Sequence, residues 1–186
     1  MKKILAILAL ATSGSVFAAT ATVEYQNING VDGGADQRNV NLTVKESVAK
    51  NFAADVQLSN TWNESNGGTS SFRAEVGGTG SMPIAQPLSL YTRVALGEKF
   101  TSTGNFSYYS IEPGMSAALG GGLSAKVGYR YRTAFNNPNV NNDTTQTVRV
   151  GLGYELSKTD AIGVGFDRVR GDSKQDVWKV NYTRSF

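Results

Sequence analysis

The sequence predicts an all-β protein: a closed, antiparallel, up-and-down transmembrane β-barrel of about ten strands, with eight or twelve strands as alternatives. Three observations support this prediction. Apolar and polar residues alternate in ten segments, and a period of two places successive side chains on opposite faces of a strand. Long and short connections between these segments also alternate. Aromatic residues gather near segment ends on the apolar face, as they do at the two interfaces of a membrane barrel.

The first five predicted strands are separated by clusters of Gly, Asn, Asp and Ser, which favour turns. Each strand is justified by the residues that share its apolar face. These are Ala21, Val23 and Tyr25 in 20–27; Val40, Leu42 and Val44 in 38–45; Phe52, Ala54, Val56 and Leu58 in 52–59; Phe72, Ala74 and Val76 in 70–77; and Leu88, Leu90, Val94 and Leu96 in 88–97.

The second five predicted strands include the most regular alternation in the chain. The exception is 106–116, where Pro113 removes a donor from the hydrogen-bond ladder. The apolar faces carry Tyr109, Ile111 and Met115 in 106–116; Leu123, Ala125, Val127, Tyr129 and Tyr131 in 123–132; Val148, Val150, Leu152 and Tyr154 in 147–155; Ile162, Val164 and Phe166 in 161–169; and Trp178, Val180, Tyr182 and Phe186 in 177–186.

The connections predict which end of the barrel carries loops. Most of those that follow odd-numbered strands are long and polar, whereas 117–122 and 156–160 are tight. Short periplasmic turns and longer outer loops are typical of membrane barrels. We expect a periplasmic turn over 78–87 as well, and this turn departs from the rule because it is longer than the others.

The chain divides into an export signal and one domain. Residues 1–18 have a basic start at Lys2 and Lys3, a short apolar core, and small residues at Val16 and Ala18 that suit cleavage after Ala18. An ordinary N-terminal helix is the alternative. We therefore expect a signal peptide over 1–18 and an outer-membrane β-barrel over 19–186. Without the two lysines the balance is 16 basic against 15 acidic residues, so the charge indicates no nucleic-acid partner.

A soluble sandwich or lipocalin-like barrel would show the same alternation. However, its polar face would meet water, and we would expect that face to be rich in Lys and Glu. In this chain the polar face carries mainly Arg, Gly and Ser. A charged content of 18% is also low for a soluble surface. These features favour the membrane barrel.

The last ten residues carry a family resemblance. Trp178, Val180, Tyr182 and Phe186 alternate on one face and the sequence stops on Phe186. This pattern resembles the terminal strand of bacterial outer-membrane β-barrels, and it departs from that strand at Arg184, where an apolar residue is preferred. The resemblance implies an outer-membrane location, recognition of these four residues by the barrel-assembly machinery, and contact with membrane lipid and lipopolysaccharide.

The polar face should then fill the lumen. Opposite charges should pair there, because a buried charge without a partner is costly. Strand order predicts pairs between Lys45 and Asp55 and between Lys126 and Glu155, and a group formed by Glu75, Arg93 and Glu112. The candidate lumen-lining residues are Arg73, Arg93, Lys126, Arg130, Arg132, Arg149, Glu75, Glu112 and Asp167.

A basic strip within this set suggests a function. Arg130, Arg132 and Arg149 lie on neighbouring strands, Asp167 is the nearest acid expected at that height, and inward glycines at 128, 151, 153, 163 and 165 leave space. Such arginines attract and orient carboxylates. In this respect the chain resembles the narrow, twelve-stranded sugar-acid channels of the oligogalacturonate porin type. We expect a narrow passive pore for small solutes or ions, weakly anion-selective or nearly closed.

The sequence is compatible with two other functional interpretations. A polar core that satisfies itself would give a purely structural barrel, and a closed barrel could serve surface adhesion. Arg170, Gly171 and Asp172 spell an integrin-type tripeptide, although Gly and Asp also suit a tight hairpin.

Catalysis is not expected. Outer-membrane enzymes of similar outline depend on a histidine, and this sequence has none. The one Ser-x-x-Lys, Ser47 to Lys50, falls in a predicted turn where nothing would lower the pKa of the lysine. Cysteine is absent as well, which excludes disulfides and thiolate metal sites. We expect no cofactor and no metal.

Overall fold

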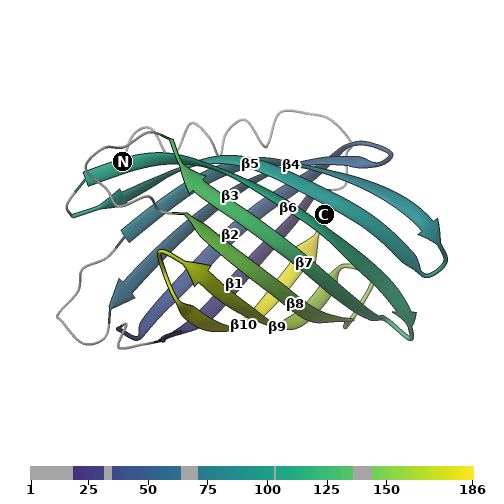
Figure 1. Ribbon diagram of the computed structural model, residues 1–186. Helices are drawn as coiled ribbons and strands as arrows, with labels where there is room; N and C mark the ends of the chain where they lie inside the picture. The colour runs from purple at the N-terminus through teal and green to yellow at the C-terminus, as the bar shows by residue number, and fades with distance from the viewer. Residues whose placement is uncertain (1–18, 32–34, 64–70, 103, 136–143) are drawn as a thin grey trace.

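The computed structural model describes residues 19–31, 35–63, 71–102, 104–135 and 144–186, which form ten antiparallel strands closed into one barrel (Figure 1). Each strand pairs with its neighbours in the chain, and β1 pairs with β10. The strands are β1 (Ala19–Gly30), β2 (Gln37–Ala49), β3 (Phe52–Asn63), β4 (Ser71–Ala85), β5 (Leu88–Thr101), β6 (Gly104–Gly120), β7 (Leu123–Ala134), β8 (Thr145–Glu155), β9 (Asp160–Gly171) and β10 (Gln175–Ser185). The ten-stranded, up-and-down barrel is therefore confirmed. The predicted signal peptide, 1–18, lies outside the described residues.

The terminal strand closes the barrel as predicted. Its register against β1 runs from Thr20 opposite Ser185 to Gly30 opposite Gln175, and the amide of Phe186 donates to the carbonyl of Ala19 at 2.9 Å. The start of β1 and the end of β10 lie at the end of the barrel where the chain makes its shorter connections. We call this the turn end and the opposite end the loop end.

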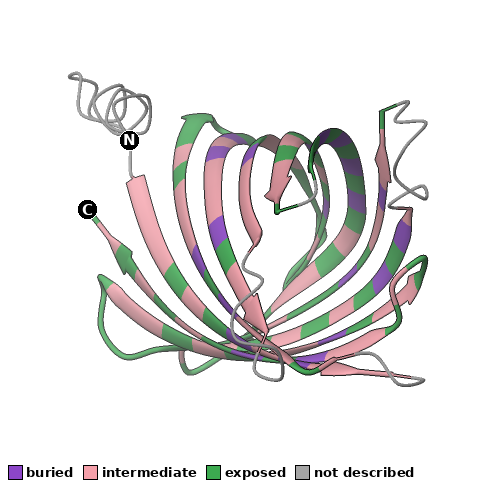
Figure 2. Cartoon of the chain, turned by 90° about the vertical axis from the view of Figure 1, so that its left-hand side faces the viewer, coloured by how far each residue is buried: buried purple, intermediate pink, exposed green. Residues whose placement is uncertain are grey.

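The alternation in the sequence becomes an apolar outer surface. Large apolar side chains stay exposed on the outward face, among them Val76 at 60%, Leu96 at 59% and Trp178 at 59%. Figure 2 shows exposed and more buried residues alternating along the strands. An apolar surface that surrounds a closed barrel suits lipid rather than water. Among the described residues, no helix is long and apolar enough to cross a membrane.

The predicted long turn at 78–87 is wrong, because most of it is strand. β4 continues to Ala85 and stays paired with β5, with a register shift between Pro83 and Ala85, although its pairing with β3 ends at Gly80 opposite Phe52. The glycine that suggested a turn, Gly78, instead makes room on the outward face. A Cβ there would come within 2.9 Å of Cζ of the Phe52 ring.

Pro83 fits the part of β4 that extends beyond β3. The amide of Ser81 donates toward β3, to the carbonyl of Asn51 at 2.8 Å. Because amides alternate in direction along a strand, the nitrogen of Pro83 points to the same side, which is now an open edge. A proline at an open edge loses no ladder bond and protects the edge from further pairing.

Pro113 also lies inside a strand. β6 is continuous from Gly104 to Gly120, so the strand predicted at 106–116 is confirmed and extends at both ends. Its register with β7 is constant on both sides of Glu112 and Pro113, but these two residues have no strand partner there. The missing donor is thus absorbed by a local gap in the ladder.

Candidate functional site

The inward face of the barrel holds two clusters of charged residues and one row of amides. The Glu75 cluster consists of Asp55, Glu75, Arg93 and Arg130, with Tyr108 and Ser110 beside them. The Glu112 cluster consists of Tyr91, Glu112, Lys126, Arg149, Asp167 and Lys179. The amide row consists of Glu24, Gln26, Asn39 and Asn41 on β1 and β2. Together they draw side chains from all ten strands.

In the Glu75 cluster, two arginines share one carboxylate. Arg93 Nη1 and Arg130 Nη2 each lie 2.5 Å from a different carboxylate oxygen of Glu75. Arg93 also donates from Nε to Asp55 at 3.0 Å, and the hydroxyl of Tyr108 donates to Glu75 at 3.0 Å. Glu75 is only 4% exposed, so these donors replace the water that a buried carboxylate has lost.

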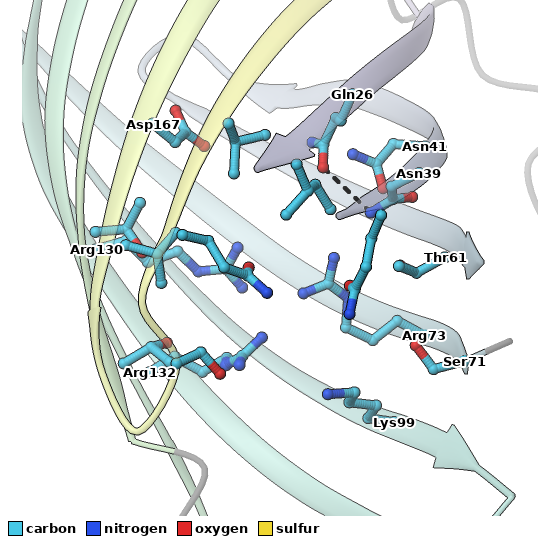
Figure 3. A pocket seen from close by; sticks show the side chains of 18 of the residues that line it. Gln26, Asn39, Asn41, Thr61, Ser71, Arg73, Lys99, Arg130, Arg132 and Asp167 are labelled. Atoms are coloured by element: carbon cyan, nitrogen blue, oxygen red, sulfur yellow. Dashed lines mark hydrogen bonds between the residues drawn. The ribbon is translucent and has the colours of Figure 1, made fainter. Parts of the chain in front are cut away.

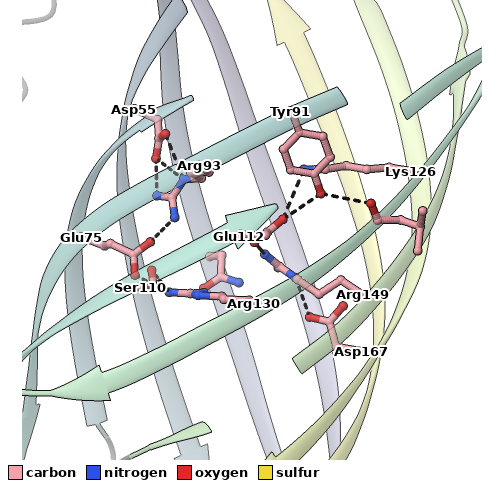
Figure 4. Close-up of polar contacts among 12 residues, drawn as sticks. Asp55, Glu75, Tyr91, Arg93, Ser110, Glu112, Lys126, Arg130, Arg149 and Asp167 are labelled. Carbon is pink, nitrogen blue, oxygen red and sulfur yellow. Dashed lines mark hydrogen bonds and ion pairs between the residues drawn. The ribbon is translucent and has the colours of Figure 1, made fainter. Parts of the chain in front are cut away.

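In the Glu112 cluster, Arg149 lies between two carboxylates (Figure 4). Its Nη1 is 2.6 Å from Glu112 and its Nε is 3.1 Å from Asp167. The chain of contacts continues on one side to Lys179, 2.5 Å from Asp167. On the other side, Glu112 accepts from the hydroxyl of Tyr91 at 3.0 Å and lies 3.6 Å from Lys126.

The amide row covers the wall where the ion pairs stop. Gln26 and Asn41 both donate to Glu24, at 2.6 and 3.0 Å, and Asn39 donates to Gln26 at 3.2 Å. Asn39 and Asn41 are each 1% exposed. The row is therefore polar, and its one charged member is Glu24.

Three cavities lie along the lumen. The loop-side cavity, of about 130 Å³, lies toward the loop end of the strands, where Lys99, Arg130 and Arg132 line it (Figure 3), and the turn-side cavity, of about 470 Å³, lies toward the turn end. A third cavity of about 310 Å³ lies beside the glycine-rich wall of β8 and β9. The cations that line the loop-side cavity are Arg73, Lys99, Arg130, Arg132 and Arg149, and its one carboxylate among the described residues is Asp167.

The basic strip predicted on β7 and β8 exists in space, but two of its members are neutralised. Arg130 is held by Glu75 and Arg149 by Glu112 as well as by Asp167. The prediction that Asp167 is the nearest acid is therefore wrong. Arginine side chains are long enough to reach carboxylates across a narrow lumen, which strand order alone does not reveal. Arg132 lies 5.3 Å above the centre of the Tyr108 ring.

Two of the predicted ion pairs are wrong as well. Lys45 stands opposite Asp55 in the register of β2 and β3, but Asp55 accepts from Arg93. Lys126 lies near Glu112 rather than Glu155. The predicted contact between Glu75 and Arg93 is confirmed at 2.5 Å. Of the other candidates, Arg73 donates from Nε to the hydroxyl of Ser59 at 3.1 Å.

The inward glycines were expected to leave open space, and several of them instead receive a neighbouring side chain. The hydroxyl of Tyr91 contacts the position that a Cβ of Gly128 would occupy. Lys179 fills the space at Gly165 in the same way, and Asn181 fills it at Gly163. At Gly151 the nearest atom is the carbonyl oxygen of Val164 at 3.5 Å, an ordinary van der Waals distance, so a Cβ would fit at this position.

Sequence reasoning missed the two tyrosines that anchor the clusters. Tyr91 stands opposite Gly114 in the register of β5 and β6, and Tyr108 stands opposite Gly97. A Cβ on either glycine would overlap with the tyrosine ring. An inward tyrosine paired with an inward glycine was therefore the available signal. Among the described residues, no group of three or more His, Cys, Asp or Glu is placed to hold a metal ion.

Comparison with known proteins supports the fold. No protein family model and no curated protein sequence matches this chain. Among solved structures, an outer-membrane channel from Pseudomonas putida F1 aligns with a TM-score of 0.59 and 10% identity, over 94% of this chain and 97% of that one. The β domain of the Bordetella autotransporter BrkA aligns with a TM-score of 0.57 and 12% identity, over 92% and 100%.

A third similar structure is the KdgM porin, with a TM-score of 0.46 and 14% identity, over 91% of this chain and 99% of that one. This degree of likeness says nothing about the lumen. With the closed barrel and its apolar exterior, the comparisons show that the chain has the fold of the outer-membrane β-barrel proteins.

Proposed function

We propose that this protein is a narrow passive pore in the outer membrane of a bacterium and that it weakly favours small anions. The observation that carries the proposal is the loop-side cavity, whose described lining has five cations and one carboxylate. A small solute that enters from the loop end meets this positive field first. Fields of one sign inside a low-dielectric wall concentrate ions of the opposite sign.

The preference is weak because carboxylates inside the barrel offset part of the charge. Arg130 and Arg149 keep contacts with Glu75 and Glu112, and Glu24 lines the turn-side cavity. The bore is narrow because barrels of this size leave a lumen little wider than their side chains. An open, water-filled channel of the large-porin kind is not what this interior supports.

Reversal potentials in planar bilayers test the proposal. Under a potassium chloride gradient, chloride should permeate about two to five times better than potassium. Arg130→Ala and Arg149→Ala should each bring this ratio closer to one, since each removes a cation from the loop-side cavity. A wild-type preference for potassium, or ratios that neither substitution changes, would contradict anion selectivity.

A closed-lumen surface protein is the second candidate, because ion pairs of the two clusters join inward side chains from β3 to β10. The tripeptide at 170–172 adds nothing to it. Gly171 has a φ of 110°, which favours glycine, and Asp172 accepts from the amide of Thr144 at 2.9 Å. Both residues are used to shape and hold the loop itself.

The terminal strand is proposed to direct assembly. Trp178, Val180, Tyr182 and Phe186 are all exposed on the outward face, Phe186 at 76%. We propose that they meet the barrel-assembly machinery and then membrane lipid and lipopolysaccharide. Deleting Phe186 should lower the amount of heat-modifiable barrel in outer-membrane fractions several-fold, whereas Ser185→Ala should not. Equal amounts of barrel from the two variants would show that Phe186 carries no signal.

A further inference from the structure

The loop-side and the turn-side cavities have two lining side chains in common. Among the described residues, Gln57 on β3 and Arg149 on β8 line both the loop-side and the turn-side cavity. Arg149 also lines the cavity beside the glycine-rich wall. These two residues therefore mark the level at which the two cavities adjoin.

Arg149 is held in place from two directions. Glu112 on β6 and Asp167 on β9 bind different nitrogens of its guanidinium group, at 2.6 and 3.1 Å. Its side chain is still 24% exposed, so it is open to the cavities as well as paired. The two carboxylates occupy the positions that an incoming anion would take on a guanidinium group.

Gln57, unlike Arg149, is uncharged. Gln57 stands between Thr43 on β2 and Glu75 on β4 in the strand registers, and Glu75 lines none of the three cavities because Arg93 and Arg130 cover it. Asn41, which also lines the loop-side cavity, is uncharged. Arg149 is thus the charged member of the pair that both cavities share.

We infer that Gln57 and Arg149 form the constriction of the pore, and that a small anion crosses it by replacing the Glu112 carboxylate on Arg149. This inference rests on the proposed pore function. It names the class of solute that the constriction accepts: small singly charged anions, including short carboxylates, which a guanidinium group binds through two parallel hydrogen bonds. A cation meets no equivalent site, since Arg149 already binds both nearby carboxylates.

The absence of cysteine makes the constriction directly testable. Gln57→Cys would carry the only thiol in the sequence, and single-channel conductance can be recorded before and after a methanethiosulfonate reagent is added. Modification should lower the conductance at least about twofold, since the added group fills the narrowest level. The matched control is Thr61→Cys on the same strand, because Thr61 lines the loop-side cavity and neither of the other two. Modification of this cysteine should have a clearly smaller effect on the conductance.

The role of Glu112 is tested by a second pair of variants. Glu112→Gln should raise the chloride preference about two- to fivefold, because Arg149 loses one of its neutralising partners. Glu155→Gln removes a carboxylate that lines none of the three cavities and should leave the preference unchanged. A heat-modifiability gel confirms that both variants have folded.

The outcomes distinguish the constriction, the exchange of anions on Arg149 and the pore function itself. Equal effects of modification at positions 57 and 61, in a protein that prefers anions, would overturn the constriction and leave the pore function intact. Equal effects of Glu112→Gln and Glu155→Gln would overturn the exchange of anions on Arg149. A wild-type protein that does not conduct at all would overturn both the pore and the constriction.

Discussion

Replacing Glu75 with alanine is expected to lower the free energy of unfolding by about 3–5 kcal/mol, the usual cost of removing one partner from a buried ion pair. Glu75 is 4% exposed. Its removal would leave Arg93 and Arg130, whose side chains are 13% and 12% exposed, with too little negative charge nearby. Equilibrium unfolding in urea, followed by the fluorescence of the two tryptophans, measures this loss in lipid vesicles.

The matched control for this experiment is Glu155→Ala. Glu155 is exposed at the turn end of β8, so its replacement should change the unfolding free energy by less than about 0.5 kcal/mol. Arg130→Ala should also cost less in the Glu75→Ala background than in the wild type, because the two residues act as a pair. A loss below about 1 kcal/mol for Glu75→Ala would show that the cluster contributes little.

Replacing Gly114 with valine is the second change with a large expected effect, a loss of about 1–3 kcal/mol from overpacking. The ring of Tyr91 lies over Gly114, where a Cβ would overlap with it, and its hydroxyl is held by Glu112. The ring therefore has no simple way to move aside. The same unfolding assay measures the change.

Gly80→Val separates this clash from a general effect of valine in a strand. A Cβ at Gly80 meets nothing within 4 Å, and valine favours a strand conformation more than glycine does. The substitution should therefore leave stability unchanged or raise it slightly. If both valines lowered stability equally, packing against Tyr91 would not explain the loss at Gly114.

The barrel itself could be predicted from the sequence because alternation is a local signal. Every strand has apolar residues on its outward face and polar residues on its inward face, so each segment could be recognised without its neighbours. The strand ends were less predictable. Gly78, Gly80 and Pro83 have the composition of a turn, but a strand that continues beyond its neighbour tolerates them, and only the pairing of β4 with β5 reveals this.

The site could be predicted in composition but not in its contacts. Parity along the strands placed Arg149, Glu112 and Asp167 on the inward face, and strand adjacency explains the contact between Arg149 and Asp167. The contact between Arg149 and Glu112 crosses from β8 to β6. It depends on side-chain length and on the width of the lumen, which no single strand encodes. Gln57 carries no charge, and its place between two cavities follows from the shape of the whole lumen rather than from its own strand.

Solute uptake by proteoliposomes shows directly whether the lumen passes small solutes and which charge it prefers. Vesicles that contain the protein should swell in isotonic solutions of small solutes of equal size, fastest with an anion, more slowly with a neutral solute and slowest with a cation. Protein-free vesicles and the Arg149→Ala protein provide the baselines. Swelling no faster than in protein-free vesicles, or fastest with the cation, would contradict an anion-favouring pore.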